Sequence, residues 1–478
     1  MGRHAKPRAF SWSVKLSSEI RRERATALIV AASLFMQNLD GTVIATALPA
    51  MGRDFHVDPV RLNVALTSYL FAVALFVPAS GWLADRFGAR RVFTAAITVF
   101  TIGSILCGQA GSMTSLIVAR LIQGAGGALM VPVGRLVLLR SVPQERIVSA
   151  MAWVTVPGLV GPVIGPPLGG LIVTYAHWRL IFDLNIPMGV IGVALALRYI
   201  KDFREVDPGP LDVVGLILSG LALAAVMGGL ELIGHAHADP WLLSGIVVGG
   251  IGCGVAYGLR ARVQTRPLLD FGLMRYPGFS ISVISGSLFR VGVGGMPFLL
   301  PLMIQIGFGR TAAQSGTITF MAAVGAIMSK TATEWMLRRF GFRRVLVVNA
   351  IGSAAGLALY AAFRPGWPVY AIYAVLFVTG FFRSLQFTGY NAIAYADVPR
   401  ERLSAATTLY SALQQVSLTV GIPISAFVLN SMRGHGEPSL HDFSAGFLTL
   451  AGLSLLAAPA AMFLPKRTGD AMAGRIRK

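Results

Sequence analysis

Ionisable side chains inside long apolar runs are the residues of this 478-residue chain whose chemistry demands an explanation. They are the acids Asp40 and Asp183 and the bases Arg120, Arg290 and Arg383. A charge at the centre of a membrane helix costs about 2.5–3.5 kcal/mol on insertion scales, so its presence predicts a function. A carboxyl group in such a place can exchange a proton between two compartments. Asp40 is therefore our first candidate for proton carriage.

Structural alternatives stay open for three of these residues. Asp40 could be permanently ion-paired or hydrogen-bonded near the end of its helix, which Pro49 would mark. Arg120 could either favour the charged form of a neighbouring acid or donate hydrogen bonds to backbone carbonyl groups. Asp183 follows Arg179 by four residues, which is the spacing of an ion pair on one helical face. A second proton site is the alternative for Asp183.

The composition places most of the chain in lipid. Hydrophobic residues make up 55% of the sequence and charged residues 13%, against about 25% charged residues in soluble domains. We therefore expect an all-α polytopic membrane protein. Apolar runs long enough to cross a bilayer predict fourteen helices, near 25–50, 62–84, 92–111, 115–138, 147–173, 180–200, 212–233, 241–260, 279–306, 312–336, 345–363, 368–392, 404–430 and 443–464.

The distribution of basic residues predicts the orientation of these helices. The net charge is +20, and about 30 of the Lys and Arg residues fall in loops and tails of one side, as the positive-inside rule requires of the cytoplasmic side. The membrane topology thus accounts for the excess of basic residues, and we expect no nucleic-acid partner. Both tails are basic, so both termini are expected in the cytoplasm of a cell with the protein in its inner (plasma) membrane. The first 24 residues are too polar for a signal peptide.

A charged, glycine-containing loop occurs twice. Arg86-Phe87-Gly88-x-Arg90-Arg91-Val92 returns 253 residues later as Arg339-Phe340-Gly341-x-Arg343-Arg344-Val345. Such a repeat predicts two halves of related topology, as in secondary transporters. Because six helices need nearer 200 residues, two extra spans are expected between the halves. The predicted organisation is a tail (1–24), a six-helix bundle (25–200), a linker with two spans (201–278), a second six-helix bundle (279–464) and a tail (465–478).

Other features narrow the chemistry. The chain contains no Gly-x-x-x-x-Gly-Lys-Ser/Thr motif for ATP, its two cysteines lie within apolar runs, and its histidines are too loosely spaced for a metal site. We expect no enzyme activity, no metal and no cofactor. A central cavity of apolar rings, methionines and polar groups would suit amphiphilic compounds. Its expected lining is Met36, Gln37, Gln123, Phe289, Arg290, Met296, Phe382, Arg383, Gln386, Asn391 and Gln414.

Three motifs resemble those of the major facilitator superfamily. The loop Gly81 to Arg91, the sequence Arg120-x-x-Gln123-Gly124-x-Gly126 and the Gly/Pro-rich run Gly158 to Gly170 are similar to its loop, fourth-helix and antiporter motifs. The segments Leu39 to Pro49 and Trp178 to Pro187 resemble its fourteen-helix drug:proton antiporter family, of the EmrB/QacA type. The amino-acid sequences of three further segments are similar to the MdtD-like branch of this family: Pro78 to Asp85, Val131 to Leu136 and Gln305 to Gly307.

This resemblance implies two six-helix bundles with two extra helices, alternating access, and efflux of hydrophobic, often cationic drugs in exchange for protons. It implies proton coupling by Asp40 and Arg120, with Asp183 as a further candidate. It also implies a conformational latch and an antiport hinge. The latch would comprise Gly81, Asp85, Arg86, Gly88, Arg90 and Arg91, and the hinge Gly161, Pro162, Gly165, Pro166, Gly169 and Gly170.

Three positions depart from the family pattern: Ala45 replaces a common Asn, Asp183 replaces an apolar residue, and Arg338 replaces the Asp expected from the first loop. The last departure argues against a symmetrical latch. Export of a lipid or amphiphilic metabolite, with Arg290 and Arg383 binding an anionic headgroup, is the alternative function. The expected partners are membrane lipids, small hydrophobic or amphiphilic substrates and protons, and the expected state is a monomer.

Overall fold

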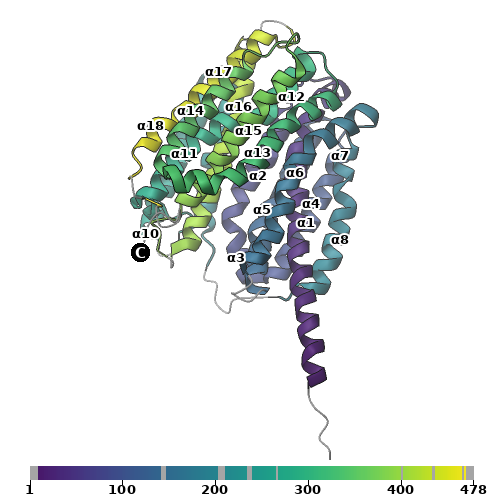
Figure 1. Ribbon diagram of the computed structural model, residues 1–478, viewed down its shortest axis with the longest axis vertical. Helices are drawn as coiled ribbons and strands as arrows, with labels where there is room; N and C mark the ends of the chain where they lie inside the picture. Colours follow the sequence, from purple (N-terminus) through teal and green to yellow (C-terminus); the bar gives the residue numbers. More distant parts are fainter. Residues whose placement is uncertain are drawn as a thin grey trace, which may run out of the picture.

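The computed structural model describes residues 9–141, 147–202, 210–233, 240–264, 267–399, 402–432, 436–465 and 468–469. The described residues form helices joined by short loops (Figure 1). Within these ranges eleven helices have the length and apolarity to cross a membrane. The helices α6 and α9 add shorter apolar segments, Val160–Tyr175 and Val213–Val226. The predicted all-α membrane fold is confirmed, and the fourteen-span count is consistent with it.

The first bundle contains the helices from α1 to α8. Their bounds are α1 Ala9–Phe55, α2 Asn63–Phe76, η1 Val77–Ala79, α3 Ser80–Phe87, α4 Ala89–Gly108, α5 Met113–Ser141, α6 Ile147–Tyr175, α7 Leu180–Asp183 and α8 Asn185–Tyr199. The helix α1 is longer than the sequence predicts, since it begins inside the expected tail.

The second bundle contains the helices from α11 to α18, and two helices lie between the bundles in the chain. The bounds of the second bundle are α11 Pro277–Gly294, α12 Met296–Leu302, η4 Met303–Gly307, α13 Ala312–Phe340, α14 Phe342–Tyr360, α15 Val369–Ile393, α16 Leu403–Met432, α17 Leu440–Leu455 and α18 Ala457–Met462. The intervening elements are α9 Val213–Ile233, α10 Pro240–Val263 and η3 Phe271–Arg275.

The internal repeat predicted from the sequence is visible in the backbone. Gly88, between α3 and α4, has φ +96°, and Gly341, between α13 and α14, has φ +78°. Only glycine adopts such angles without strain, so each tight turn between two helices needs it. The aromatic pairs repeat as well: Trp82 meets Phe87 edge-on at 6.0 Å between ring centroids, and Trp335 meets Phe340 at 5.8 Å.

The bundles meet most extensively through α6 with α13 and α2 with α16, and α1 also contacts α12. Gly170 lies against the backbone of Ala312, and Gly316 lies against the backbone of Pro166, so a side chain at either glycine would meet main-chain atoms. The amide of Ala313 also donates a hydrogen bond to Thr174 Oγ1 at 2.9 Å. These contacts hold the bundles together near the end of α6.

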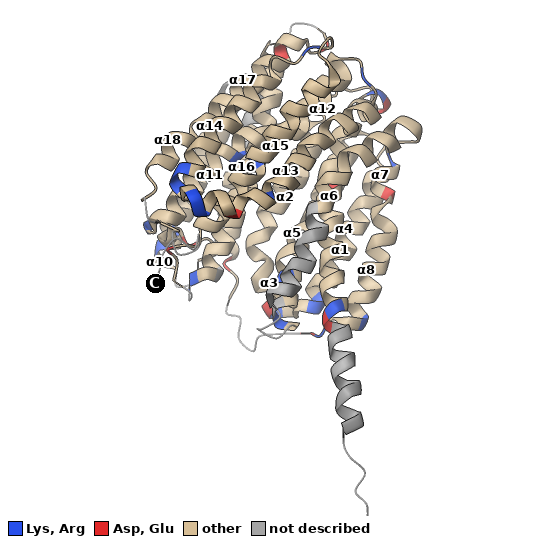
Figure 2. Cartoon of the chain, in the orientation of Figure 1, with Lys and Arg blue, Asp and Glu red and all other residues tan. Residues whose placement is uncertain are grey.

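The opposite end of the first bundle carries a group of arginines, and we call it the basic end (Figure 2). Arg86 lies in the last turn of α3, Arg140 in the last turn of α5 and Arg198 in the last turn of α8. The close contacts between α6 and α13 therefore lie away from the basic end.

The intervening helices α9 and α10 form a hairpin that packs on α2 and α16 through α9. Asp212 stabilises the hairpin because its Oδ1 atom accepts hydrogen bonds from the amide of Gly215 (2.9 Å) and from Arg260 Nε (2.9 Å). Only 6% of the most apolar 18-residue stretch of α10 is buried, as expected of a helix that faces lipid.

The close approach of α13 and α15 gives a test of this packing. A Cβ atom at Gly380 would overlap the backbone of Ala322. We therefore expect Gly380→Ala to lower the free energy of unfolding by about 1–3 kcal/mol, measured by thermal unfolding in one detergent. Gly252→Ala on α10 is the matched control, because no atom outside its own helix segment lies within 4 Å. Equal unfolding temperatures for the two variants would contradict the packing.

Candidate functional site

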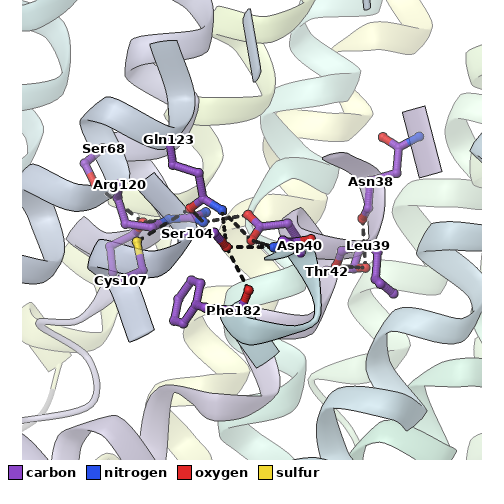
Figure 3. Close-up of polar contacts among 12 residues, drawn as sticks. Asn38, Leu39, Asp40, Thr42, Ser68, Ser104, Cys107, Arg120, Gln123 and Phe182 are labelled. Carbon is purple, nitrogen blue, oxygen red and sulfur yellow. Dashed lines mark hydrogen bonds and ion pairs between the residues drawn. The ribbon is translucent and has the colours of Figure 1, made fainter. Parts of the chain in front are cut away.

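Asp40 lies in the middle of the apolar part of α1 and is 4% exposed. The helix keeps its turn here although two polar side chains are adjacent, because the Thr42 hydroxyl donates to the carbonyl groups of Asn38 and Leu39, both at 3.0 Å. Thr42 thus turns away from Asp40 (Figure 3). The carboxylate of Asp40 faces α4, α5 and α8 inside the first bundle.

Three side chains donate hydrogen bonds to the Asp40 carboxylate. Arg120 Nη1 lies 2.6 Å from Oδ2, and Gln123 Nε2 lies 2.8 Å from Oδ1, both on α5. Asn185 Nδ2, at the start of α8, lies 3.0 Å from Oδ1. Both ions are nearly inaccessible to solvent, with side-chain exposures of 0% for Arg120 and 2% for Asp40. This is a desolvated ion pair held by neutral amide donors.

Ser104 on α4 links these amides into one network (Figure 3). Its hydroxyl accepts from Asn185 Nδ2 (2.9 Å) and Gln123 Nε2 (3.2 Å) and donates to the carbonyl of Phe182 (3.0 Å). We call Asp40, Ser104, Arg120, Gln123 and Asn185 the Asp40 network. Four helices contribute to it, so any motion of α1 relative to α4, α5 or α8 must change its hydrogen bonds.

Arg120 is held from several further directions. Its Nε donates to the carbonyl of Ala65 (3.1 Å), its Nη1 also donates to Gln123 Oε1 (2.7 Å), and its guanidinium lies 4.3 Å from the ring centroid of Tyr69. Within the described residues Nη2 has no hydrogen-bond partner. The two roles that the sequence left open for Arg120 therefore coexist, because it binds both a backbone carbonyl and the acid.

The sequence did not assign roles to Ser104, Asn185 or Tyr69. Asn185 lies in the segment Trp178 to Pro187, which resembles a family motif. A side-chain amide within an apolar run could have indicated that Asn185 has a buried polar partner. Ser104 gives no such signal, because a serine in a membrane helix commonly bonds to its own backbone.

Asp183 lies outside this network, and the expected pair between Arg179 and Asp183 is wrong for the described structure. Arg179 Nη1 instead lies 2.6 Å from Asp54 Oδ2 at the end of α1, and its Nη2 donates to the carbonyl of Ala110 (2.9 Å). Trp178 Nε1 donates to the same Asp54 oxygen at 3.1 Å. Asp183 is partly buried beside Gly108. Its role in proton coupling stays a prediction.

The predicted latch residues find partners that the sequence did not indicate. Asp85 Oδ1 lies 3.3 Å from Arg140 Nη2 at the end of α5. Asp202, beyond α8, accepts from the amide of Arg90 (3.1 Å) and lies 3.6 Å from Arg91 Nε. An anion at the first turn of α4 also meets the positive end of the helix dipole. Arg86 ends α3, and Gly81 has open space at its Cβ position.

The predicted hinge residues lie at close helix contacts. Gly161, Gly165 and Gly169 share one face of α6 and pack against α1, next to Leu39, Thr42 and Thr46 respectively. On another face Pro166 and Gly170 meet α13, while Pro162 is partly buried. Small residues allow this approach of backbones in lipid. The helix α6 therefore connects α1, which carries Asp40, with the second bundle.

Comparison with known proteins places the chain in a family. The sequence model of the Major Facilitator Superfamily matches residues 30–213 and 282–475. The chain belongs to the Major Facilitator Superfamily. It is 36% identical over 402 residues to "Putative multidrug resistance protein MdtD" of Salmonella heidelberg (strain SL476), covering 84% of this chain and 85% of that protein. The same identity and coverage hold for the MdtD protein of Salmonella newport (strain SL254).

Solved structures of the superfamily share the fold. The D-xylose-proton symporter superposes with a TM-score of 0.65 at 15% identity, covering 93% of this chain and 98% of the symporter. A bacterial homologue of the lysosomal transporter Spinster, inward-facing and unoccupied, gives 0.63 at 14% identity, covering 94% and 97%. The predicted recognition is confirmed: this is a multi-pass membrane transporter of the superfamily, similar to MdtD proteins, and not an enzyme.

The residues expected to line a substrate cavity divide between the two bundles of this superfamily fold. Met36 and Gln123 are buried in the first bundle, and Phe289, Arg290, Met296 and Gln386 in the second. Gln37, Phe382, Arg383 and Gln414 are partly buried, and Asn391 is exposed. Their role as a cavity stays a prediction, since several of them serve packing or hydrogen bonding within a single bundle.

Polar residues of the second bundle form their own contacts. Gln386 on α15 donates to Tyr390 Oη (2.9 Å) and accepts from Asn349 Nδ2 (2.7 Å) on α14. Arg290 on α11 donates to Tyr410 Oη and lies 3.4 Å from Asn391 Oδ1. Neither Arg290 nor Arg383 pairs with a carboxylate of the described ranges, which distinguishes the second bundle from the first.

The ion pair of the Asp40 network predicts strong coupling between its members. Arg120→Gln leaves the Asp40 carboxylate buried without its counter-ion, so we expect a loss of about 3–5 kcal/mol in unfolding free energy. The double variant Asp40→Asn, Arg120→Gln should recover most of this loss, because it removes both charges. Thermal unfolding of the parent, both single variants and the double variant measures the coupling. Additive effects of the two substitutions would contradict it.

Proposed function

We propose that this transporter exports hydrophobic compounds in exchange for protons, and that Asp40 carries the proton. The observation that carries the proposal is the Asp40–Arg120 pair: a desolvated carboxylate in the middle of a membrane helix, bound by three donors. Open space begins next to it, since Gly41 has no atom outside its own helix segment within 4 Å of its Cβ position. A proton arriving there meets the one acid of the Asp40 network.

Protonation of Asp40 would change the balance of charges in the network. The neutral acid no longer compensates Arg120, whose remaining acceptors are the carbonyl of Ala65 and the amide oxygen of Gln123. A buried charge without a counter-ion costs several kcal/mol. The protonated form therefore favours a different packing, in which Arg120 meets water or another acceptor. Deprotonation restores the arrangement seen here.

The contacts of α1 supply the route from this change to the two bundles. The helix α1 packs on Gly161, Gly165 and Gly169 of α6, and α6 packs on α13 of the second bundle. A shift of α1 is transmitted because close-packed backbones cannot absorb it. The available driving force is about 1.4 kcal/mol per pH unit and about 2.3 kcal/mol per charge for each 100 mV.

The names of the relatives and the basic residues of the second bundle support two candidate classes of cargo. MdtD proteins carry the name of multidrug resistance proteins, which supports hydrophobic drugs as cargo, cationic ones included. Protonation of Asp40 from outside would favour one conformation, and cargo binding from inside would favour the deprotonated one. This opposition is the basis of the exchange. Export of an amphiphile with an anionic group is the second candidate, favoured by Arg290 and Arg383, which lack carboxylate partners in the described part of the chain.

We further propose that the protein resides in the inner membrane as a monomer, with both termini and the basic end in the cytoplasm. The positive-inside rule supports this orientation. Its partners would then be membrane lipids, protons and small hydrophobic or amphiphilic substrates, with no nucleic acid. With the basic end inside, the contacts of Gly170 with Ala312 and of Gly316 with Pro166 close the external side.

The experiment is transport of a lipophilic cation into proteoliposomes, driven by a pH gradient. We expect Asp40→Asn to reduce gradient-driven transport by about 100-fold, because the amide cannot release a proton, while cation binding at equilibrium persists. Asp183→Asn tests the competing proton site in the same assay.

Glu334→Gln is the matched control, since this acid is 73% exposed and pairs with Arg338 on its own helix. If Asp40→Asn transports normally and Asp183→Asn does not, Asp183 carries the proton instead of Asp40. Normal transport by both variants would refute proton carriage by either acid, and a parent that moves no cation would refute the cationic cargo.

A further inference from the structure

The second bundle encloses a small cavity between α11, α12, α13, α14 and α15. About 10 Å³ of it is open to the centre of a water-sized sphere. Its lining is apolar apart from one cation and three hydroxyl groups. The lining residues that carry the argument are Met296, Ser353, Leu357, Tyr360, Thr379 and Arg383, and we call this space the Arg383 cavity.

Arg383 brings an uncompensated positive charge to the cavity. It forms no ion pair or hydrogen bond with any residue that the structure describes, in contrast to Arg120. A guanidinium in an apolar surrounding lacks the solvation that water supplies, which is costly unless an anion or acceptor replaces it. Arg383 is only partly buried, so the cavity has an accessible edge.

Two hydroxyl groups in the cavity also lack partners. Tyr360 is 0% exposed and Ser353 is 1% exposed, and neither hydroxyl has a hydrogen-bond partner within the described ranges. Thr379, beside Tyr360, donates instead to the carbonyl of Val375 at 2.7 Å. Neither hydroxyl is committed to a backbone acceptor, so both can donate to an acceptor that enters the cavity.

The ligand chemistry follows from these three groups. A guanidinium and two O–H donors all seek an acceptor, and a negatively charged oxygen or a halide satisfies them together. The open volume is small, which limits the occupant to about one atom of this kind inside the cavity. The largely apolar walls strengthen the attraction between the occupant and the cation.

We propose that the Arg383 cavity binds one anionic atom, and that Arg383, Tyr360 and Ser353 donate hydrogen bonds to it. The source is either the acidic headgroup of an amphiphilic cargo, whose chain lies outside the cavity, or a free inorganic anion. The headgroup version rests on the proposed function and names the cargo class of its second candidate. Arg290 is a poorer site, because its Nη2 already donates to Tyr410 and Asn391 and the residue is only 1% exposed.

The test is equilibrium binding of radiolabelled dodecanoate to the full chain in lipid nanodiscs, with empty nanodiscs subtracted and no pH gradient. We expect Arg383→Gln to weaken dodecanoate binding by about tenfold or more, as a charge-assisted hydrogen bond implies. Arg344→Gln is the matched control, an exposed arginine in the first turn of the neighbouring α14, and should leave the affinity within about twofold.

Competition distinguishes the two sources of the anion. Displacement of dodecanoate by chloride would identify an inorganic anion site that the headgroup can share, and the absence of displacement would identify the headgroup as the occupant. The proposal is overturned if the parent binds neither anion, if Arg383→Gln binds dodecanoate like the parent, or if it loses dodecyltrimethylammonium binding to the same extent.

Tyr360→Phe separates anion binding from folding. Removal of an unsatisfied buried hydroxyl should leave the unfolding temperature equal or higher without ligand, yet lower dodecanoate affinity by about three- to tenfold. A less stable variant with unchanged affinity would refute the role of this hydroxyl. Dodecanoate binding is measured without a pH gradient, so the failure of proton coupling in the transport assay and the failure of this site give different results.

Discussion

The pairing of Asp40 with Arg120 in a nearly solvent-inaccessible interior is the constraint on which the first bundle depends. Neither ion is stable there alone, so Gln123 and Asn185 donate hydrogen bonds to the carboxylate, and Ser104 accepts from both amides. Four helices are consequently linked through the network around one carboxylate. Any event that neutralises that carboxylate acts on the packing of the whole bundle, which is the property that a proton-driven transporter needs.

The glycines of α6 allow this helix to pack closely on α1, which carries Asp40, and on α13 of the second bundle. Gly161, Gly165 and Gly169 bring α1 close on one side, and Gly170 with Pro166 brings α13 close on another. Contacts of backbone with backbone leave no flexible side chain to absorb a displacement. The salt bridge of Asp85 with Arg140 and the binding of Asp202 at the start of α4 fix the basic end separately. Opening of one end and closing of the other can then alternate.

The two bundles share topology but differ in charge. The turns at Gly88 and Gly341 and the aromatic pairs beside them are copies. The first bundle nevertheless pairs a buried acid with a buried base, whereas the second carries Arg290 and Arg383 with no carboxylate partner in the described residues. The two halves therefore share a scaffold and differ in the charged groups that they bury.

The sequence alone determined the membrane class, the positions of the helices and the repeat, because apolar length and glycine punctuation are local properties. It also indicated Asp40, Arg120 and Gln123, since polar groups in lipid need a reason. Only the tertiary structure decided the partners. Arg179 pairs with Asp54, 125 residues away, instead of Asp183 on its own helix, and Ser104 joins the Asp40 network without any local signal. Ion pairs between helices depend on which faces meet, and spacing along one helix does not contain that information.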